Sequence, residues 1–274
     1  MWRNLLLLPV DVARIATMFS NGLDEARALQ RTGRTAEAIA AFEAIEQRAS
    51  NTLERANILP FLCGAYEKGG RLDDALRAGR AAVAAAAVCS DQSIGAHAKL
   101  SLGSALFAAF FRKGPIDPEW DRFEEAMALV GAASETYEKA GQIDYASALL
   151  IMAESYRAVD ILDGAGALWF RVVGELSEEP WLPTASEEMG RHIDYLRGRA
   201  WMGLGYVALR YIDGEEARRR FDIAVELLQS GEPQVFKGDL EAIAETLAGK
   251  LGDVEAAEQL RRRAAAALST QAEW

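Results

Sequence analysis

Two stretches of this sequence, residues 59–82 and 201–224, carry apolar and small residues at the same offsets. The shared positions are Leu59, Leu62, Cys63, Tyr66, Ala75 and Ala82 in the first stretch and Trp201, Leu204, Gly205, Ala208, Ala217 and Ala224 in the second. Many of these positions lie three, four or seven residues apart, which is the spacing of one face of a helix. Gly69-Gly70 interrupts the first stretch, and Asp213-Gly214 interrupts the second. Each stretch therefore predicts two helices joined by a short turn.

Small residues mark the second helix of each predicted pair along most of the chain. These seam alanines are Ala38, Ala75, Ala126, Ala165, Ala217 and Ala257. A small residue is needed wherever two helix backbones approach closely. The pattern resembles the tetratricopeptide repeat (TPR), whose period is about 34 residues. The resemblance implies an all-α fold, a right-handed α-solenoid of about six antiparallel helix pairs.

Irregular places in the repeat spacing set the expected organisation. The connections at residues 114–118 and 178–183 each contain two prolines, which cannot lie inside a helix without breaking it. The best-formed pair is expected at residues 57–68 and 72–88. We expect a lead-in and short helix at residues 1–18, a TPR-like repeat domain at residues 19–269 and a tail at residues 270–274.

Charge and apolar content bear on the kind of partner. The formal net charge of −11 argues against nucleic acid and against an anionic membrane, because both require a basic surface. No apolar run approaches the roughly 18 residues of a membrane span, so we expect no membrane partner.

The reactive residue types are sparse. Cys63 and Cys89 fall in helical apolar patterns without metal-ligand spacing, which favours reduced thiols and a cytoplasmic location. His97 and His192 are isolated from any nucleophile or carboxylate at a recognisable spacing. We therefore expect no enzyme activity, no metal and no cofactor.

The TPR resemblance implies that ligands bind along a concave wall formed mainly by the first helix of each pair. The positions expected to face that wall are Arg27, Asn57, His97, Leu100, Ser104, Phe107, Leu150, Glu154, Arg157, Arg199, Met202 and Tyr206. The apolar and aromatic members suit an extended or helical segment with apolar anchors, steered by Arg157 and Arg199. The alternative for each residue is ordinary packing between helices.

Some family members clamp a terminal carboxylate with basic and asparagine residues, but Leu23, Pro60 and Gly64 occupy several of those positions here. A receptor for such a terminus is therefore not expected. The leading hypothesis is a scaffold or adaptor that binds another protein or a peptide segment. The alternative is a peptide- or ligand-responsive regulator of the same fold.

Two further segments carry exposed-aromatic or apolar signals. Trp181 lies between Pro180 and Pro183 and is a possible loop contact, although it could also fold back onto a helix. Trp2 and Leu5 to Leu8 could dock on a second copy and give a homo-oligomer, or cap their own first helix pair, which we prefer.

Overall fold

Helices account for all regular structure in the part of the chain that the computed structural model describes, residues 22–113, 119–177, 187–211, 213–228 and 233–269. The chain divides into two compact units, residues 1–133 and 134–274, and the boundary falls within α6 (Trp120–Lys139). The prediction of one repeat domain at residues 19–269 stays a prediction. The expected ends at residues 1–18 and 270–274 lie outside the described residues.

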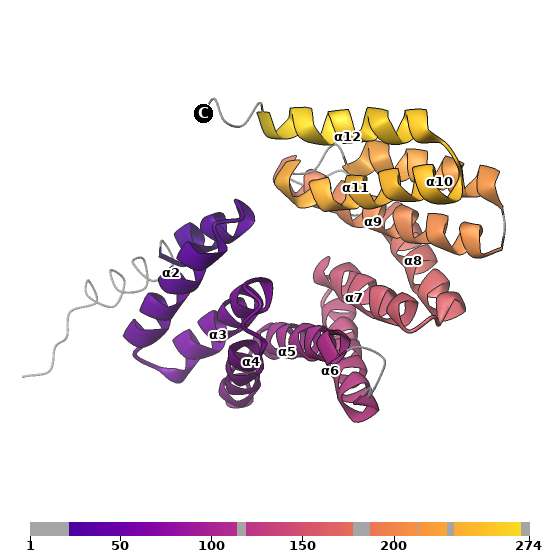
Figure 1. Ribbon diagram of the computed structural model, residues 1–274. Helices are drawn as coiled ribbons and strands as arrows, with labels where there is room; N and C mark the ends of the chain where they lie inside the picture. The colour runs from indigo at the N-terminus through magenta and orange to yellow at the C-terminus, as the bar shows by residue number, and fades with distance from the viewer. Residues whose placement is uncertain (1–21, 114–118, 178–186, 212, 229–232, 270–274) are drawn as a thin grey trace, which may run out of the picture. The chain divides into compact units, whose positions relative to one another are not determined.

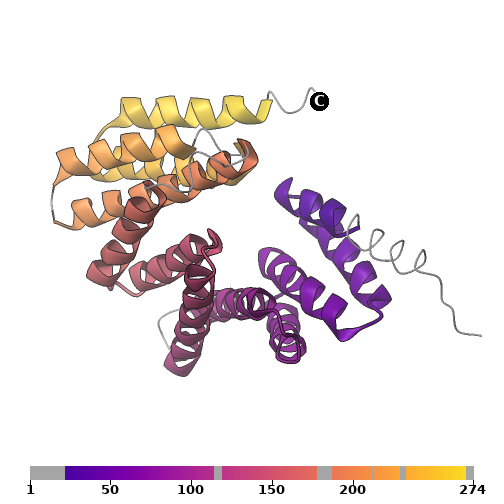
Figure 2. The ribbon, with the colours of Figure 1, turned by 180° about the vertical axis from the view of Figure 1, so that it is seen from behind.

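Six helix pairs follow one another along the described chain (Figure 1). Unit 1 holds the helix at residues 22–31, α2 (Thr35–Arg48), α3 (Thr52–Lys68), α4 (Leu72–Ala86), α5 (Gln92–Lys113) and most of α6. Unit 2 holds the end of α6, α7 (Asp144–Ala158), α8 (Leu162–Ser177), α9 (Glu187–Arg210), α10 (Gly214–Leu228), α11 (Pro233–Lys250) and α12 (Val254–Ser269). Partners contact each other in four of these pairs, α3 with α4, α7 with α8, α9 with α10 and α11 with α12. Successive first helices also contact each other, α3 with α5 and α7 with α9 with α11. The view from behind shows the same pairing of α9 with α10 and of α11 with α12 (Figure 2).

One helix begins earlier than its apolar pattern indicates. Helix α3 begins at Thr52 because the Asn51 side chain accepts a hydrogen bond of 2.9 Å from the Glu54 N–H. The expected helix begins at residue 57, whereas in the structure Pro60 lies well inside the helix, where its missing N–H removes one main-chain bond.

The turn inside a pair uses one residue in the left-handed region. Gly70 has φ +71° between α3 and α4, and Asp160 has φ +63° between α7 and α8. In both turns the following residue donates its N–H to a carbonyl five residues back, Arg71 to Tyr66 at 2.9 Å and Ile161 to Tyr156 at 2.8 Å. These bonds satisfy carbonyls at the helix end. Asp160 thus adopts the left-handed conformation that glycine usually adopts at this position of the turn.

The seam alanines lie where the repeat pattern predicts. All six, from Ala38 to Ala257, have no exposed surface. Glycines serve the same purpose on α9, since a Cβ on Gly203 would lie 2.2 Å from the Trp169 ring and one on Gly205 would lie 2.5 Å from the Phe221 ring. Close packing of these rings on the helix backbone therefore explains the two glycines.

The expectation that no segment could span a membrane is wrong by length and composition. Residues 92–112 of α5 have a mean hydropathy of 1.3 over their most apolar window. Half of that window is buried inside the protein, where α5 packs on α3 and α4. Because core helices pass the same test, this single segment does not by itself point to a membrane.

Candidate functional site

A cluster of charged side chains joins three successive first helices of unit 2. Arg199 of α9 lies between Glu154 of α7, with 3.6 Å from Nη2 to Oε1, and Asp239 of α11, with 3.6 Å from Nε to Oδ1. The Arg199 Nη1 group also donates to the Tyr195 hydroxyl at 3.2 Å. We call Glu154, Arg157, Arg199, Tyr206 and Asp239 the polar wall.

The charges of the polar wall are largely buried and incompletely hydrogen-bonded. Their side chains are 22% exposed at Glu154, 28% at Arg199 and 16% at Asp239. Glu154 Oε1, Arg199 Nε and Asp239 Oδ2 are buried without a hydrogen-bond partner within the described structure. Buried polar atoms normally form hydrogen bonds, and a buried polar atom without one costs free energy. These atoms distinguish the cluster from the exposed ion pairs elsewhere on the protein.

Burial and charge move two pKa values in the polar wall. Burial raises the pKa of Asp239 above its ordinary value, Arg199 opposes this, and Glu154 adds to it. Burial lowers the pKa of Arg199, but the charges of Asp239, Tyr195 and Glu154 outweigh it and raise the pKa overall. Arg199 is therefore a permanent cation held between carboxylates.

Arg157 forms the more accessible edge of the polar wall and lies over Tyr206. Arg157 is 42% exposed and contacts Glu154 Oε2 at 2.9 Å. Its guanidinium carbon lies 5.4 Å from the centre of the Tyr206 ring, within the range of a cation–π contact. An arginine over an aromatic ring presents both charge and apolar area, which is typical of binding surfaces.

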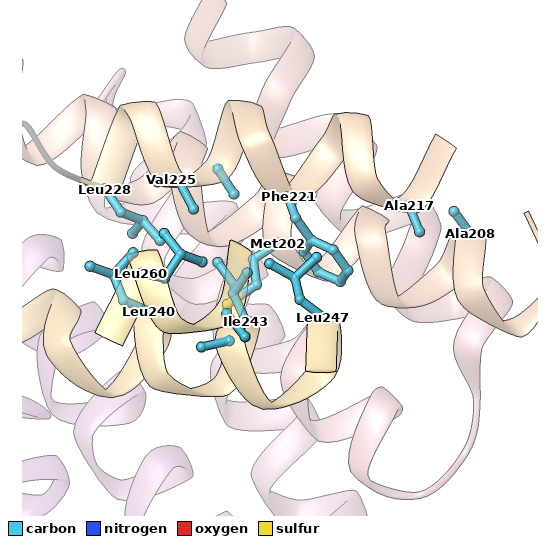
Figure 3. Close-up of a cluster of buried hydrophobic side chains, with 13 residues drawn as sticks. Met202, Ala208, Ala217, Phe221, Val225, Leu228, Leu240, Ile243, Leu247 and Leu260 are labelled. Carbon is cyan, nitrogen blue, oxygen red and sulfur yellow. The ribbon is translucent and has the colours of Figure 1, made fainter. Parts of the chain in front are cut away.

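Two residues of unit 2 that were expected to face a ligand are core residues here. Met202 is 5% exposed and Leu150 is 7% exposed. Figure 3 shows Met202 pointing toward Phe221 and Ile243, in the cluster that joins α9, α10 and α11. These side chains offer a partner little surface, and in the described structure they pack between helices.

Two residues expected at the wall in unit 1, Arg27 and His97, meet at Phe61 of α3, which sequence reasoning missed. Arg27 lies over the Phe61 ring at 5.1 Å, and His97 meets the same ring edge-on at 4.7 Å. Asn57, one turn earlier, turns its amide back to the Leu53 carbonyl at 2.8 Å. Phe61 lies one turn after Asn57, a spacing that could have identified it.

Farther along the same helices, Ser104 donates to Glu67 of α3 at 3.1 Å. Burial raises the pKa of Glu67, and the Ser104 hydrogen bond opposes this. Leu100, one turn before Ser104, is partly buried, and Phe107 is 4% exposed within an aromatic cluster. Glu67 was also missed, because its partner comes from another helix pair.

Other expected contacts lie outside the described residues or remain untested. Trp181, Trp2 and Leu5 to Leu8 fall in parts of the chain that are not described. Among the described residues, no group of three or more His, Cys, Asp or Glu side chains is placed to hold a metal ion. The binding roles predicted for the wall residues stay predictions.

Comparisons with known proteins identify the fold. No protein-family model and no curated protein matches the sequence. A protein of Podosopora anserina described as a kinesin light chain with nearly identical TPR-like repeats matches with a TM-score of 0.54 and 16% identity, over 77% of this chain and 94% of that one. BtubC (BKLC) from P. vanneervenii matches with a TM-score of 0.53 and 16% identity, over 79% of this chain and 90% of that one.

At this level of identity the likeness concerns the fold alone. The chain has the fold of a TPR-like helical repeat protein, an all-α solenoid of paired helices. The expected fold class is confirmed, and its right-handed sense stays a prediction.

Proposed function

We propose that this protein is a non-enzymatic interaction module that binds a segment of a partner protein on the first helices of its pairs. TPR-like repeats are a kind of fold suited to holding other proteins, because stacked pairs present a long continuous surface. The polar wall is the observation that carries the proposal for this chain. It combines a cation, two carboxylates and an arginine-covered tyrosine on three successive first helices.

The polar wall supports binding more than chemistry. Its arginines pair with its carboxylates, so the charges are already engaged and no side chain in the set is a nucleophile beside a base. Partly exposed opposite charges next to an aromatic ring instead fix the orientation and register of a docking segment. Arg157 is the member that a partner would reach first, because it is the most exposed of the charged side chains.

The test uses two arginines of unit 2 with nearly equal exposure. Arg157 on first helix α7 is 42% exposed, and Arg171 on second helix α8 is 40% exposed; both pair with glutamates. We expect Arg157→Glu to remove the proteins that co-purify with the tagged full-length chain from its native cell. Arg171→Glu should leave them bound. Retention of every partner by Arg157→Glu, or equal loss in both variants, would refute the proposed surface.

A second candidate is a regulator that responds to a peptide or another ligand. Arg199 favours it, because one side chain links α9 to α7 and to α11. A ligand that competes for Arg199 or Asp239 would loosen α11 from its neighbours. Hydrogen exchange of α11 in the presence of candidate peptides tests this reading, and unchanged exchange with a bound peptide would rule it out.

A further inference from the structure

A surface depression of about 580 Å³ lies beside α4 and the beginning of α6, and none of its lining residues belongs to the polar wall. Its lining residues are Arg80, Glu119, Trp120, Asp121, Arg122 and Glu125. All six belong to unit 1, and Arg80 and Trp120 come from the second helices of two successive pairs. The volume falls within the range of small-ligand pockets, large enough for the end of a long side chain and part of its main chain.

An exposed tryptophan forms the apolar part of this depression. Trp120 is 50% exposed. Its ring packs on Phe110 at 5.4 Å and on Phe123 at 5.8 Å between centres, so the buried side of the indole is held in place. The exposed part is a rigid aromatic surface. Because the ring is already held in place, it loses little conformational freedom when a ligand binds.

The charges around Trp120 leave one carboxylate in excess. Arg122 pairs with Glu119 at 2.7 Å, and Arg80 pairs with Glu125 at 3.6 Å. Asp121 is exposed and has no cation within ion-pair distance among the described residues. Three carboxylates thus face two guanidinium groups, and the unmatched one lies next to the indole along the chain.

An aromatic face beside an unpaired carboxylate complements a planar cation. A guanidinium group can stack on an indole and donate two parallel hydrogen bonds to a carboxylate, whereas an ammonium group lacks the flat face and the fork. We propose that this depression binds an arginine side chain from a basic segment of a partner protein, which stacks on Trp120 and pairs with Asp121. The site is separate from the polar wall and does not rest on the function proposed for it.

The charge of the whole chain supports the choice of a basic segment. The formal net charge is −11, so a basic segment would be attracted from a distance, whereas nucleic acid would be repelled. General attraction alone, however, would not single out Trp120. A test must therefore report on this one ring.

The experiment is fluorine NMR on the full-length chain labelled with 5-fluorotryptophan, with the Trp120 signal assigned by its loss in Trp120→Phe. Tetra-arginine is the probe, and tetra-citrulline, which has the same shape without the charge, is its control. We expect tetra-arginine to shift the Trp120 signal saturably and tetra-citrulline to leave it in place. Asp121→Asn should weaken the apparent affinity about threefold, as the loss of one exposed ion pair does.

Asp222→Asn is the matched control, because it removes the same charge from an exposed position of α10 in unit 2. This variant should bind tetra-arginine at Trp120 as the unchanged protein does. The proposal is overturned if the Trp120 signal does not move, if tetra-citrulline moves it equally, or if both aspartate variants weaken binding to the same extent. The remaining tryptophan signals report whether each variant is folded.

Discussion

Helix α9 makes two kinds of contact, the close packing of aromatic rings and ion pairs with neighbouring first helices. Gly203 and Gly205 let the rings of Trp169 and Phe221 pack directly on the helix backbone. Arg199, on the same helix, instead reaches two carboxylates of neighbouring first helices at 3.6 Å and leaves polar atoms without partners. Close packing at the glycines gives the fold its stability, whereas the imperfect polar contacts are where a ligand has something to gain.

The largest expected effect is at the packed glycine. Gly203→Ala should lower the free energy of unfolding by about 3 kcal/mol, because its Cβ would overlap the fully buried Trp169 ring. Chemical denaturation of the full-length chain measures this loss. Gly174→Ala on α8 is the control, since its Cβ would meet nothing within 4 Å and alanine favours a helix by about 0.5–1 kcal/mol. Equal effects of the two changes would contradict the packing difference.

The next effect is at the polar wall. Arg199→Ala should cost about 2 kcal/mol, because it leaves the Asp239 carboxylate largely buried without a cation and leaves Glu154 with Arg157 alone. Arg171→Ala, whose partners Glu138 and Glu175 are about half exposed, should change stability by no more than about 0.5 kcal/mol. If both substitutions cost the same in urea titrations, the polar wall is an ordinary surface cluster.

Two carboxylates of unit 2 should respond to pH with opposite signs. Asp239 has a pKa raised above its ordinary 3.8 by burial, so its contribution to stability is present below pH 3.8 and is lost as the pH rises through the raised value. Glu216, bonded to Arg219 and Arg220, has a pKa lowered from 4.5 to about 2, so its contribution is present above pH 4.5 and is lost as the pH falls toward 2.

Melting temperatures of Asp239→Asn and Glu216→Gln across the acid range measure these two contributions. Relative to the Asn variant, the unchanged protein should lose stability as the pH rises from 3.8. Relative to the Gln variant, it should gain stability as the pH rises from 2 to 4.5. The same sign of slope for both variants would mean that Asp239 is not desolvated in solution.

The smallest effect is expected at the turn between α7 and α8, where the exposed Asp160 pairs with Arg210 at 3.7 Å. Asp160→Gly should raise stability by about 0.5 kcal/mol, because glycine adopts φ +63° without strain and the turn keeps its main-chain hydrogen bonds. Gly70→Asp at the equivalent turn should lower stability by about 1 kcal/mol. Thermal melts of both variants measure the two effects. A loss of stability in Asp160→Gly would show that the aspartate side chain stabilises the turn by more than its left-handed backbone strains it.

The sequence predicted the packing contacts of α9 better than its polar ones. Seam alanines such as Ala217 and the small residue at Gly205 lie at offsets shared between helix pairs, so spacing alone identifies them. The polar wall needs residues from three pairs, and Asp239 comes from the weakest repeat, where no pattern fixed which face of α11 meets α9. Met202 was placed on the ligand side for the same reason, since a rotation of one residue separates the wall from the core.

The central claim is that a partner contacts the first helices of unit 2. A photoactivatable benzoylphenylalanine at position 157 of α7, compared with the same residue at position 171 of α8, tests that contact directly in the native cell. The account predicts a discrete crosslinked protein from position 157 and none, or a different background, from position 171. The absence of any crosslink at 157, or the same product from both positions, would contradict it.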